Sequence, residues 1–494
     1  MSSSTRSKRE SRNFRLEPGR NCWRISRAHR ASLIVDAADY FRLARQAMLK
    51  ARSQIMLMGW DVDTRIDLDP SADGEEAPVH VGPLVSWLIK HRPDLHIHIL
   101  AWDGEAYRYA GRGSTLFRLG TWAMKKRIHF KLDHVHPRAA SHHQKILVID
   151  DSLAFCGGID ITGSRWDTRA HCDDHPDRRE PTTRRAYEPW HDAIMAVDAG
   201  AAHCLGDLAR LRWLAATGKK LPSANPHPHD YWPEALEPDF HDVDVGIART
   251  RGQYSDWGEV REIEKLFVDL IASARHFVYI ETQYFASRVV AEAIARRLAE
   301  PDGPEFVVVN PKTGFGWLDE SVMGPARAEL VRALGEKDRY GRFRIYNPVT
   351  EGGADIYVHA KVMIVDDVAI RVGSANLNNR SMGLDSECDL LIDCRLPANK
   401  NAGAKIEALR ADLIAEHLGV EPADVHSLCK ERGSLIAVIE RLRGDGRTLV
   451  PFEPPHPGGL AKSIARTELL DPESAGEPFE PRSRHRLLSG LRGR

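Results

Sequence analysis

One short pattern, H-x-K-x-x-x-x-D, occurs twice in the 494-residue chain. Each copy joins an imidazole, an ammonium group and a carboxylate within a few positions. The members are His143, Lys145 and Asp150 in the first copy, and His359, Lys361 and Asp366 in the second. A single match at such loose spacing arises easily by chance. Two matches, each followed by a Gly-Gly or Gly-Ser pair shortly after the Asp, predict a functional site.

These residue types suit a reaction at a phosphodiester. Two imidazoles and two ammonium groups in one pocket favour an anion whose negative charge grows during the reaction. One neutral imidazole can attack phosphorus as a nucleophile, and the other, protonated, can give its proton to the leaving alcohol. The lysines can stabilise charge on the phosphoryl oxygens. This scheme requires no metal ion and no cofactor, and we expect neither in the site.

The segments around both motifs are predicted strands. KILVI and KVMIV are apolar runs of the kind that forms a buried strand. Side chains two positions apart on a strand point to the same side, so the His and Lys of each motif share a face. The Asp of each motif comes just after its strand, at odd spacing from the His. We expect this Asp to fix the turn or the local charge.

A histidine nucleophile needs an acceptor that orients its other ring nitrogen. The best candidates are Asp192 and Glu387, because each heads a predicted strand at an equivalent place in the two halves of the chain. We pair Asp192 with His143 and Glu387 with His359, as a hypothesis. A longer loop in the first half accounts for the larger sequence separation of the first pair.

The elements that must position these residues form an internal repeat. QIMLMGWD (54–61) corresponds to HFVYIETQ (276–283), LHIHILAW to EFVVVN, RIHFKL to RFRIYN, and DAIMAVD to ECDLLID. Short apolar strands alternate with helical patterns in both halves, which is typical of α/β folds. We therefore expect an α/β protein with two similar lobes. Each lobe is a mixed, mostly parallel sheet flanked by helices, and the lobes share one active site.

Composition shifts divide the chain into five segments. They are a basic N-terminal arm (1–30), a first lobe (31–220), a Pro/His-rich linker (221–249), a second lobe (250–420) and a C-terminal extension (421–494). The arm is expected to be solvated, with contact to anionic lipid as the alternative. The part of the extension after about residue 450 is expected to be loosely packed.

Charge and cysteine content exclude several classes of protein. Lys and Arg total 69 and Asp and Glu total 70, so a strongly basic nucleic-acid binder is not indicated. Seven cysteines without a C-x-x-C pair argue against a disulfide framework and a zinc ribbon, and fit a reducing compartment. No apolar run reaches the ~20 residues that span a bilayer, and the N-terminus has no apolar signal region. We expect a cytoplasmic protein that associates peripherally with membranes when it acts, with secretion without a signal peptide as the alternative.

Several histidines and acids near the first motif resemble a metal cluster. They are His134, His136, His142, His171, Asp173, Asp174 and His175. Their spacing fits no standard metal site, and we expect them to line a polar mouth of the site or a solvated loop.

The motifs and their neighbours resemble the phospholipase D superfamily, which is defined by paired HKD motifs. The resemblance covers most of residues 31–420 and is that of a minimal, bacterial-type enzyme. It rests on HHQKILVIDDSLAFCGGIDITGSRWD, EPWHDAIMAVDAGAA, YIETQYF and YVHAKVMIVDDVAIRVGSANLNNRSMGLDSE.

The resemblance implies a monomer with one site at a pseudo-twofold axis. It implies a phosphohistidine intermediate, with His143 as nucleophile and His359 as general acid, which water or a primary alcohol then resolves. It also implies residues that bind substrate or line the pocket. These are Asn376 and Ser374, Asp160 at the equivalent place in the first lobe, and Gln283 and Tyr284.

The resulting expectation is a phospholipase D, a phosphoric diester hydrolase of lipid degradation. It would cleave the distal phosphodiester of glycerophospholipids at a membrane surface to phosphatidic acid and a free head-group alcohol, with transphosphatidylation as a side reaction. The first alternative is a phosphatidyltransferase of the cardiolipin-synthase kind, which needs the same residues. A nuclease of the same superfamily is disfavoured by the fused repeat and the near-zero net charge, so no nucleic-acid partner is expected. A non-enzymatic membrane scaffold is disfavoured because both motifs are complete.

Overall fold

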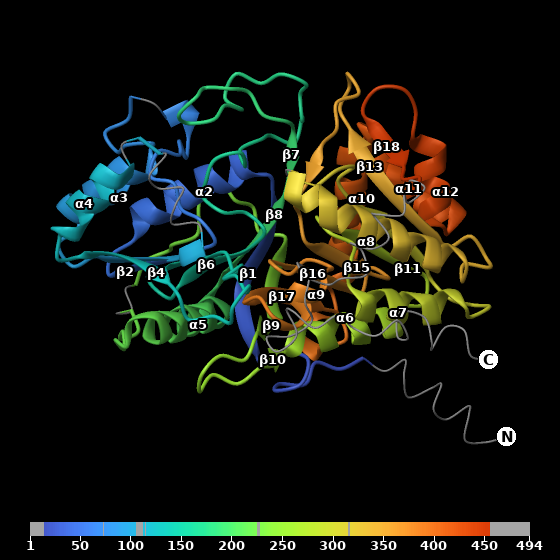
Figure 1. Cartoon of the computed structure of the whole chain (residues 1–494), viewed down its shortest axis with the longest axis horizontal. Coiled ribbons are helices and arrows are strands. Elements are labelled where there is room, and N and C mark those ends of the chain that lie inside the picture. The colour runs from blue at the N-terminus through green and yellow to red at the C-terminus, as the bar shows by residue number, and fades with distance from the viewer. Residues whose placement is uncertain are drawn as a thin grey trace.

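The computed structural model describes residues 14–72, 74–104, 112–113, 115–224, 228–314 and 317–454. The chain forms two α/β lobes side by side, the first drawn in blue to green and the second in yellow-green to red (Figure 1). A single mixed sheet of 16 strands runs through both lobes of the described part. The mixed α/β class and the helices on the sheet faces agree with the sequence prediction.

The order of strands in the sheet is the same in both lobes. In the first lobe it is β4 (Ile128–Asp133), β3 (His96–Trp102), β2 (Gln54–Gly59), β5 (Ile146–Ile149), β6 (Leu153–Gly157) and β8 (Ala193–Asp198). In the second lobe it is β13 (Phe343–Val349), β12 (Glu305–Val309), β11 (Phe277–Glu281), β15 (Val362–Val365), β16 (Ala369–Gly373) and β17 (Glu387–Asp393). These are the segments that the internal repeat aligns.

Two long strands join the lobes. β1 (Arg24–Val35) and β9 (Phe240–Arg251) pair with each other in antiparallel fashion at the centre of the sheet. β1 also pairs with β8, and β9 pairs with β17 and with the short β10 (Val260–Arg261). The order β8-β1-β9-β17 therefore repeats about a pseudo-twofold axis between β1 and β9.

Most strand pairs are antiparallel, and the expectation of mostly parallel sheets was wrong. Parallel pairing is confined to β2–β3–β4 and β11–β12–β13 in the large sheet. The strand after each motif returns as a hairpin, β5–β6 and β15–β16, and the following strand returns again. A short turn between two neighbouring strands makes them antiparallel. Parallel neighbours need a longer crossover connection, which is usually a helix.

Helices cover both faces of the sheet. Their bounds are α2 (Ala37–Lys50), α3 (Val81–His91), α4 (Thr115–Ala123), α5 (Ala199–Thr217), α6 (Glu262–Ser273), α7 (Arg288–Leu298), α8 (Trp317–Gly335), α9 (Asn379–Gly383), α10 (Gly403–Leu418), α11 (Pro422–Arg432) and α12 (Leu435–Leu442). One apolar cluster packs α5 and α10–α12 against one face across both lobes. Separate clusters pack α2 and α3 in the first lobe, and α6 and α7 in the second, against the other face.

Three predicted boundaries differ from the structure. Residues 14–30 are not a solvated arm, because Phe14, Leu16 and Cys22 are buried against the second lobe and β1 begins at Arg24. The linker ends before residue 240, where β9 starts. The extension up to residue 451 belongs to the second lobe, where β18 (Thr448–Pro451) pairs with β13. These stretches are rich in charged residues or proline, which led to the prediction of arm, linker and extension. Their apolar residues nevertheless pack into the lobes. Residues 1–13 and 455–494 lie outside the described residues.

Across the described ranges, the helices are either too short or too polar to span a bilayer.

Candidate active site

Each motif segment is held in place by the opposite lobe. His143 and Lys145 lie in extended backbone directly before β5, and the amide of His143 donates to the carbonyl of Ser386 in the second lobe at 2.9 Å. Likewise, the amide of His359 donates to the carbonyl of His191 in the first lobe at 2.7 Å. This reciprocal bonding brings the two predicted imidazoles together, with 6.4 Å between ring centroids.

The contact at His359 includes a two-stranded parallel sheet that is separate from the large sheet. β14 (Tyr357–Val358), just before His359, pairs with β7 (Trp190–His191) of the first lobe. A bridge between His142 and Ser386 occupies the equivalent place on the other side. The motif segments thus run alongside the strands that carry the predicted acceptors.

The acceptors are exchanged between the lobes, so the predicted pairing was wrong. Nδ1 of His359 lies 2.6 Å from Oδ2 of Asp192, and Nδ1 of His143 lies 3.1 Å from Oε2 of Glu387. Each acid heads a strand beside the pseudo-twofold axis, next to the motif segment of the other lobe. The equivalent positions of Asp192 and Glu387 in the repeat identify both acids. These positions do not show whether each acid contacts the histidine of its own lobe or the histidine of the other lobe.

The two imidazoles differ in what faces Nδ1. Nδ1 of His143 lies 3.0 Å from the backbone carbonyl oxygen of Ser374 as well as near Glu387. A carbonyl oxygen can only accept, so Nδ1 carries the hydrogen. In a neutral ring this leaves Nε2 with a free lone pair. The Nδ1 contact of His359, in contrast, goes to a carboxyl group, which can accept or, when protonated, donate.

Burial dominates the ionisation of the site. It lowers the pKa of His143, with help from Lys145 and Lys361, and it lowers the pKa of His359, with help from Lys361 and Arg165. Burial also raises the pKa of Asp192 to about 7 and that of Glu387 to about 8. The rings are therefore neutral, and the carboxyl groups hold protons close to neutral pH.

The two lysines have different partners. Nζ of Lys145 lies 3.0 Å from Oδ2 of Asp160 and 2.9 Å from the carbonyl of His143. Nζ of Lys361 donates to the carbonyl of His359 and lies 3.4 Å from Oε1 of Gln283. Burial lowers the pKa of Lys361 to about 7. Lys145 is thus paired with a carboxylate, whereas Lys361 lies next to an amide.

The residues predicted to bind substrate divide into two groups. Asn376 is buried, and its side-chain oxygen has no hydrogen-bond partner in the described part of the chain, which suits an amide that contacts a bound group. Gln283, beside Lys361, donates to the hydroxyls of Tyr284 and Tyr357 and so belongs to the wall of the site.

Ser374 and Asp160 are turned toward the protein, in contrast to the predicted contact with substrate. The hydroxyl of Ser374 donates to Oε2 of Glu387 at 2.5 Å. Asp160 pairs with Lys145 and accepts the backbone amide of Trp60 at 2.9 Å. The Ser374 hydroxyl is therefore already engaged, whereas Oδ2 of Asp160 is in ion-pair range of Lys145 but has no hydrogen-bond partner in the described part of the chain. Both side chains contact other residues of the site.

The motif acids Asp150 and Asp366 lie away from the imidazoles and have the anchoring geometry that their spacing suggested. Asp150 accepts the backbone amides of Arg52, Ser53 and Gln54 at the start of β2. Asp366 accepts those of residues 275–277 at the start of β11. Each fixes its hairpin to the neighbouring strand.

Sequence reasoning missed Arg165. Its guanidinium is buried 4.4 Å above the ring of Trp190, and Trp190 lies 5.2 Å from His359 between ring centroids. Arg165 lowers the pKa of both His359 and Asp192 and so adds a third cation to the site. The R-W-D segment after the first motif contained this signal, which was used only as part of the resemblance.

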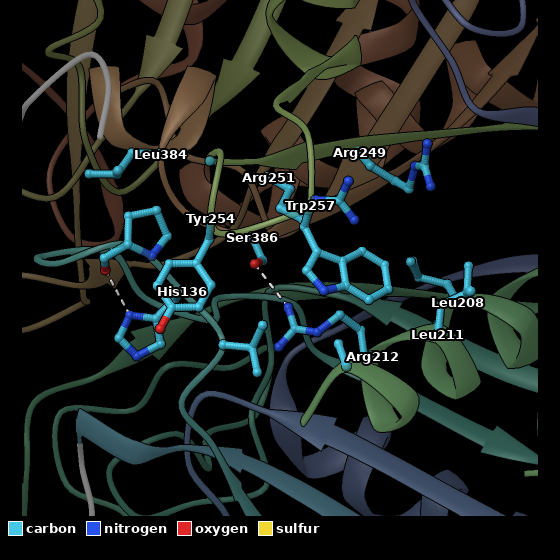
Figure 2. Close-up of a pocket in the computed structure, with 14 residues that line it drawn as sticks. His136, Leu208, Leu211, Arg212, Arg249, Arg251, Tyr254, Trp257, Leu384 and Ser386 are labelled. Atoms are coloured by element: carbon cyan, nitrogen blue, oxygen red, sulfur yellow. Dashed lines mark hydrogen bonds between the residues drawn. The ribbon is translucent and has the colours of Figure 1, made fainter. Parts of the chain in front are cut away.

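A pocket of about 40 Å³ is lined by residues of both lobes, among them Ser386 (Figure 2). Arg212, Arg249, Arg251, Tyr254 and Trp257 contribute to its lining. Ser386 forms part of the wall, and Figure 2 shows Arg212 donating to the Ser386 hydroxyl, at 2.9 Å. Neither imidazole lines this pocket, so it is adjacent to the catalytic groups rather than their meeting place.

Comparisons with known proteins show what the chain is similar to. Residues 347–434, which include the second motif, match a family model described as Phospholipase D. Phospholipase D A of Dictyostelium discoideum is 26% identical over 79% of this chain and 36% of its own length. Phospholipase D1 of Schizosaccharomyces pombe is 24% identical over 78% of this chain and 35% of its own length. Phospholipase D zeta 1 of Arabidopsis thaliana is 30% identical over 43% of this chain and 26% of its own.

The chain thus spans only about a third of the length of the first two relatives. Among solved structures, phosphatidylserine synthase of Haemophilus influenzae superposes with a TM-score of 0.54 and 14% identity. The match covers 90% of this chain and 99% of the synthase, and at this identity the likeness is one of fold.

Proposed function

The chain belongs to the phospholipase D superfamily, and we propose that it hydrolyses the distal phosphodiester of glycerophospholipids to phosphatidic acid and a free head-group alcohol. One observation carries this proposal. Two imidazoles from equivalent places in the two lobes face each other across 6.4 Å, each with a carboxyl partner and a lysine from a matching position. A phosphoryl group between them has a nucleophile on one side and a proton donor on the other.

In the first step, His143 attacks. Its Nδ1 hydrogen is bound to the Ser374 carbonyl, so the Nε2 lone pair forms the bond to phosphorus. The bond between phosphorus and the head-group oxygen breaks, and that oxygen takes a proton from Nε2 of His359. Protonated Asp192 donates to Nδ1 of neutral His359, whose Nε2 carries the hydrogen. As the Nε2 proton leaves, the Asp192 proton moves to Nδ1, so the ring stays neutral and Asp192 becomes a carboxylate. The product is a phosphatidyl-histidine.

In the second step, water resolves the intermediate. His359, now without its Nε2 hydrogen, takes a proton from water, and the oxygen attacks phosphorus while the bond to His143 breaks. Lys145, Lys361 and Asn376 bind the phosphoryl oxygens in both steps. All of these groups belong to the chain, so the proposed reaction uses no cofactor.

A primary alcohol can replace water in the second step. The alcohol transfers its proton to His359 and its oxygen to phosphorus, which gives a phosphatidyl-alcohol. This transfer is the phosphatidyltransferase alternative, and it uses the same residues. Both halves of the site lie in one chain, so we propose that the enzyme acts as a monomer at a membrane surface, where its substrate lies.

The test is product analysis by mass spectrometry after incubation with mixed-phospholipid vesicles, with and without ethanol. We expect phosphatidic acid without ethanol and phosphatidylethanol with it. His143→Ala and His359→Ala should each nearly abolish both products, whereas His203→Ala, a half-exposed histidine on α5, should retain activity. The head group that disappears identifies the substrate.

Two results would contradict the proposal. One is a complete absence of lipid products with every head group. The other is full activity of either purified histidine variant. With a p-nitrophenyl ester, whose leaving group needs no proton, an acid-labile phosphatidyl adduct on His143 that accumulates in His359→Ala would identify the nucleophile directly. The same adduct on His359 in the His143→Ala variant would reverse the two roles.

A further inference from the structure

A second cluster of titratable side chains lies behind Asp192. It consists of four buried residues from segments far apart in the sequence, and their nitrogen and carboxylate oxygen atoms lie within 4.8 Å of one another. They are Asp36 between β1 and α2, His171 in the inserted loop of the first lobe, His191 in β7, and Glu416 in α10 of the second lobe.

The distances between these atoms are close to those between ligands of one metal ion, and the two to Glu416 are also within hydrogen-bond range. Nε2 of His171 lies 3.1 Å from Oε1 of Glu416 and 3.3 Å from Oδ2 of Asp36. Nδ1 of His191 lies 3.0 Å from Oε1 of Glu416 and 3.4 Å from Oδ1 of Asp36. Zinc binds His and carboxylate at about 2.0–2.2 Å in a tetrahedron, which places neighbouring ligand atoms about 3.3–3.5 Å apart.

One atom of the cluster lacks a hydrogen bond. Oδ2 of Asp36 has no hydrogen-bond partner within the described ranges, although Asp36 is only 1% exposed. It is in ion-pair range of His171 without the geometry of a hydrogen bond. A buried carboxylate oxygen in this state is costly, and a cation between the four side chains would satisfy it.

The outward-facing nitrogens of both imidazoles contact further carboxylates. Nδ1 of His171 lies 3.1 Å from Asp167, and Nε2 of His191 lies 2.9 Å from Glu281. Carboxylate–histidine–metal arrangements of this kind orient the ring and increase its basicity in metal sites. Asp167 is bound in turn by Arg178, and Glu281 by the hydroxyl of Tyr279.

A divalent cation suits the charge of the four side chains. Asp36 and Glu416 supply two carboxylates, whose charge one dication between neutral imidazoles would balance. Arg169 donates to Oε2 of Glu416, which leaves Oε1 facing the two imidazoles.

We propose that Asp36, His171, His191 and Glu416 form a structural site for one divalent transition-metal ion, with Zn²⁺ as the best match to a buried set of two imidazoles and two carboxylates. Of these four residues, only His171 was among the metal candidates in the sequence, because the four ligands come from four separate segments. The ion would join the inserted loop and β7 of the first lobe to α10 of the second.

The site would act on catalysis only by positioning. His191 directly precedes Asp192, and the amide of Asp192 donates to Oδ1 of Asp36 at 3.0 Å. An ion on Asp36 and His191 would therefore fix the carboxyl group that contacts His359. It would touch neither the substrate nor the reacting atoms.

The test measures metal content and not activity. Untagged full-length protein is dialysed against a chelator, then against buffered Zn²⁺, and analysed by elemental mass spectrometry. We expect about one Zn²⁺ per chain in the wild type and almost none in His171→Ala or Glu416→Gln. His175→Ala is the matched control from the same loop, and it should bind as the wild type does.

Two further measurements test the proposal even if the ligand variants fail to fold. Asp167→Asn leaves all four ligands in place and should weaken Zn²⁺ binding about 10–100-fold at unchanged stoichiometry. Co²⁺ in place of Zn²⁺ should give the visible absorption of a tetrahedral ion in the wild type. Absence of Zn²⁺ and Co²⁺ uptake by wild-type protein, or equal uptake by wild type and His171→Ala, would overturn the proposal, and the cluster would then be a proton-bridged network. Neither outcome depends on whether the protein cleaves phospholipids.

Discussion

The two imidazoles that we propose as catalytic come from equivalent positions of a repeat, yet their surroundings are not equivalent. A backbone carbonyl fixes the hydrogen on Nδ1 of His143, whereas a carboxyl group with a pKa of about 7 contacts Nδ1 of His359. The first arrangement suits a nucleophile and the second suits a proton donor. The aligned motifs also differ at single positions, with Ser374 opposite Gly158 and Asn376 opposite Asp160.

Because each acid contacts the histidine of the other lobe, we expect substitutions of Asp192 and Glu387 to affect turnover differently. Asp192→Asn removes the proton source of His359, so it should cost about 10²-fold or more with an alkyl head group. The loss should be much smaller with a p-nitrophenyl ester, whose leaving group needs no proton. Glu387→Gln should reduce turnover of both substrates equally and more mildly, because the Ser374 carbonyl still orients His143. Steady-state kinetics on the two substrates make this comparison.

Asp174→Asn is the matched control, since its exposed carboxylate lies in the same lobe and makes only a surface pair. The opposite pattern, with Glu387→Gln rescued by the activated ester and Asp192→Asn not, would mean that Glu387 serves the proton donor, and it would contradict the proposed roles of the two histidines.

Glu387 should also make stability depend on pH. Its carboxyl group ionises near 4.5 in an unfolded chain, but burial raises the folded pKa to about 8. Between these values the unfolded chain releases a proton that the folded chain retains. The favourable contribution of this group is therefore complete below about pH 4.5 and is lost as the pH rises to about 8.

Glu387→Gln removes this dependence. The free energy of unfolding of the variant minus that of the wild type should become more positive from pH 5 to pH 8. Denaturant titrations of both proteins at several pH values measure the difference, and contributions of other groups cancel in it. A difference that stays constant with pH would show that Glu387 ionises as easily in the folded protein as in the unfolded chain.

The sequence predicted the residues of the site better than it predicted the contacts between them. Residue type and spacing identified the histidines, the lysines and both acids, because function constrains these identities directly. They could not distinguish Asp192 beside His143 from Asp192 beside His359, since a pseudo-twofold axis makes the two pairings equivalent in register. The side-chain orientations of Ser374 and Asp160 depend on which neighbouring groups bind their polar atoms. Spacing in the sequence does not predict these neighbours.

At the scale of elements, the motif acids join each hairpin to the adjacent strand. Asp150 accepts three successive amides at the start of β2. Asp150→Ala would leave these donors unpaired in a largely buried place and should lower the free energy of unfolding by about 3 kcal/mol or more. Denaturant unfolding measures this. The folded fraction should keep most of its activity, because Asp150 does not contact the imidazoles.

Asp174→Ala, at the surface, is the control for loss of a carboxylate and should leave stability nearly unchanged. Full stability of Asp150→Ala combined with loss of turnover would contradict the anchoring role and place Asp150 in the chemistry.

The repeat predicted five of the six strands of each lobe, because short apolar runs are a strong local signal. It did not predict β1 and β9. The first half of β1 alternates arginine and histidine with small residues, and β9 follows a proline-rich stretch, so both were taken as connections. Their strand form depends on pairing with each other across the lobe boundary, which is a tertiary effect that local pattern does not encode.

At the scale of the whole molecule, the lobes are joined by a continuous sheet and by the exchanged contacts, and only secondarily by the linker. A protease site inserted between Lys220 and Leu221, in the exposed stretch after α5, should therefore allow cleavage with little loss of activity. The nicked protein should elute as one particle of unchanged size. Size-exclusion chromatography and the vesicle assay test this.

Each fragment separated by denaturation should be inactive alone, because each catalytic histidine would lack its acceptor. Activity of either isolated fragment would contradict the shared site. An immediate loss of activity on nicking would mean that the linker, rather than the sheet and the exchanged contacts, keeps the lobes together.

The exchange of acceptors also determines how the enzyme responds to dilution. Two separate lobes would form a working site only above the concentration at which they associate. In the fused chain the second lobe is present at an effective concentration in the millimolar range, whatever the amount of protein. Turnover per molecule should thus stay constant down to a single copy on a vesicle, where a bimolecular assembly would fall apart.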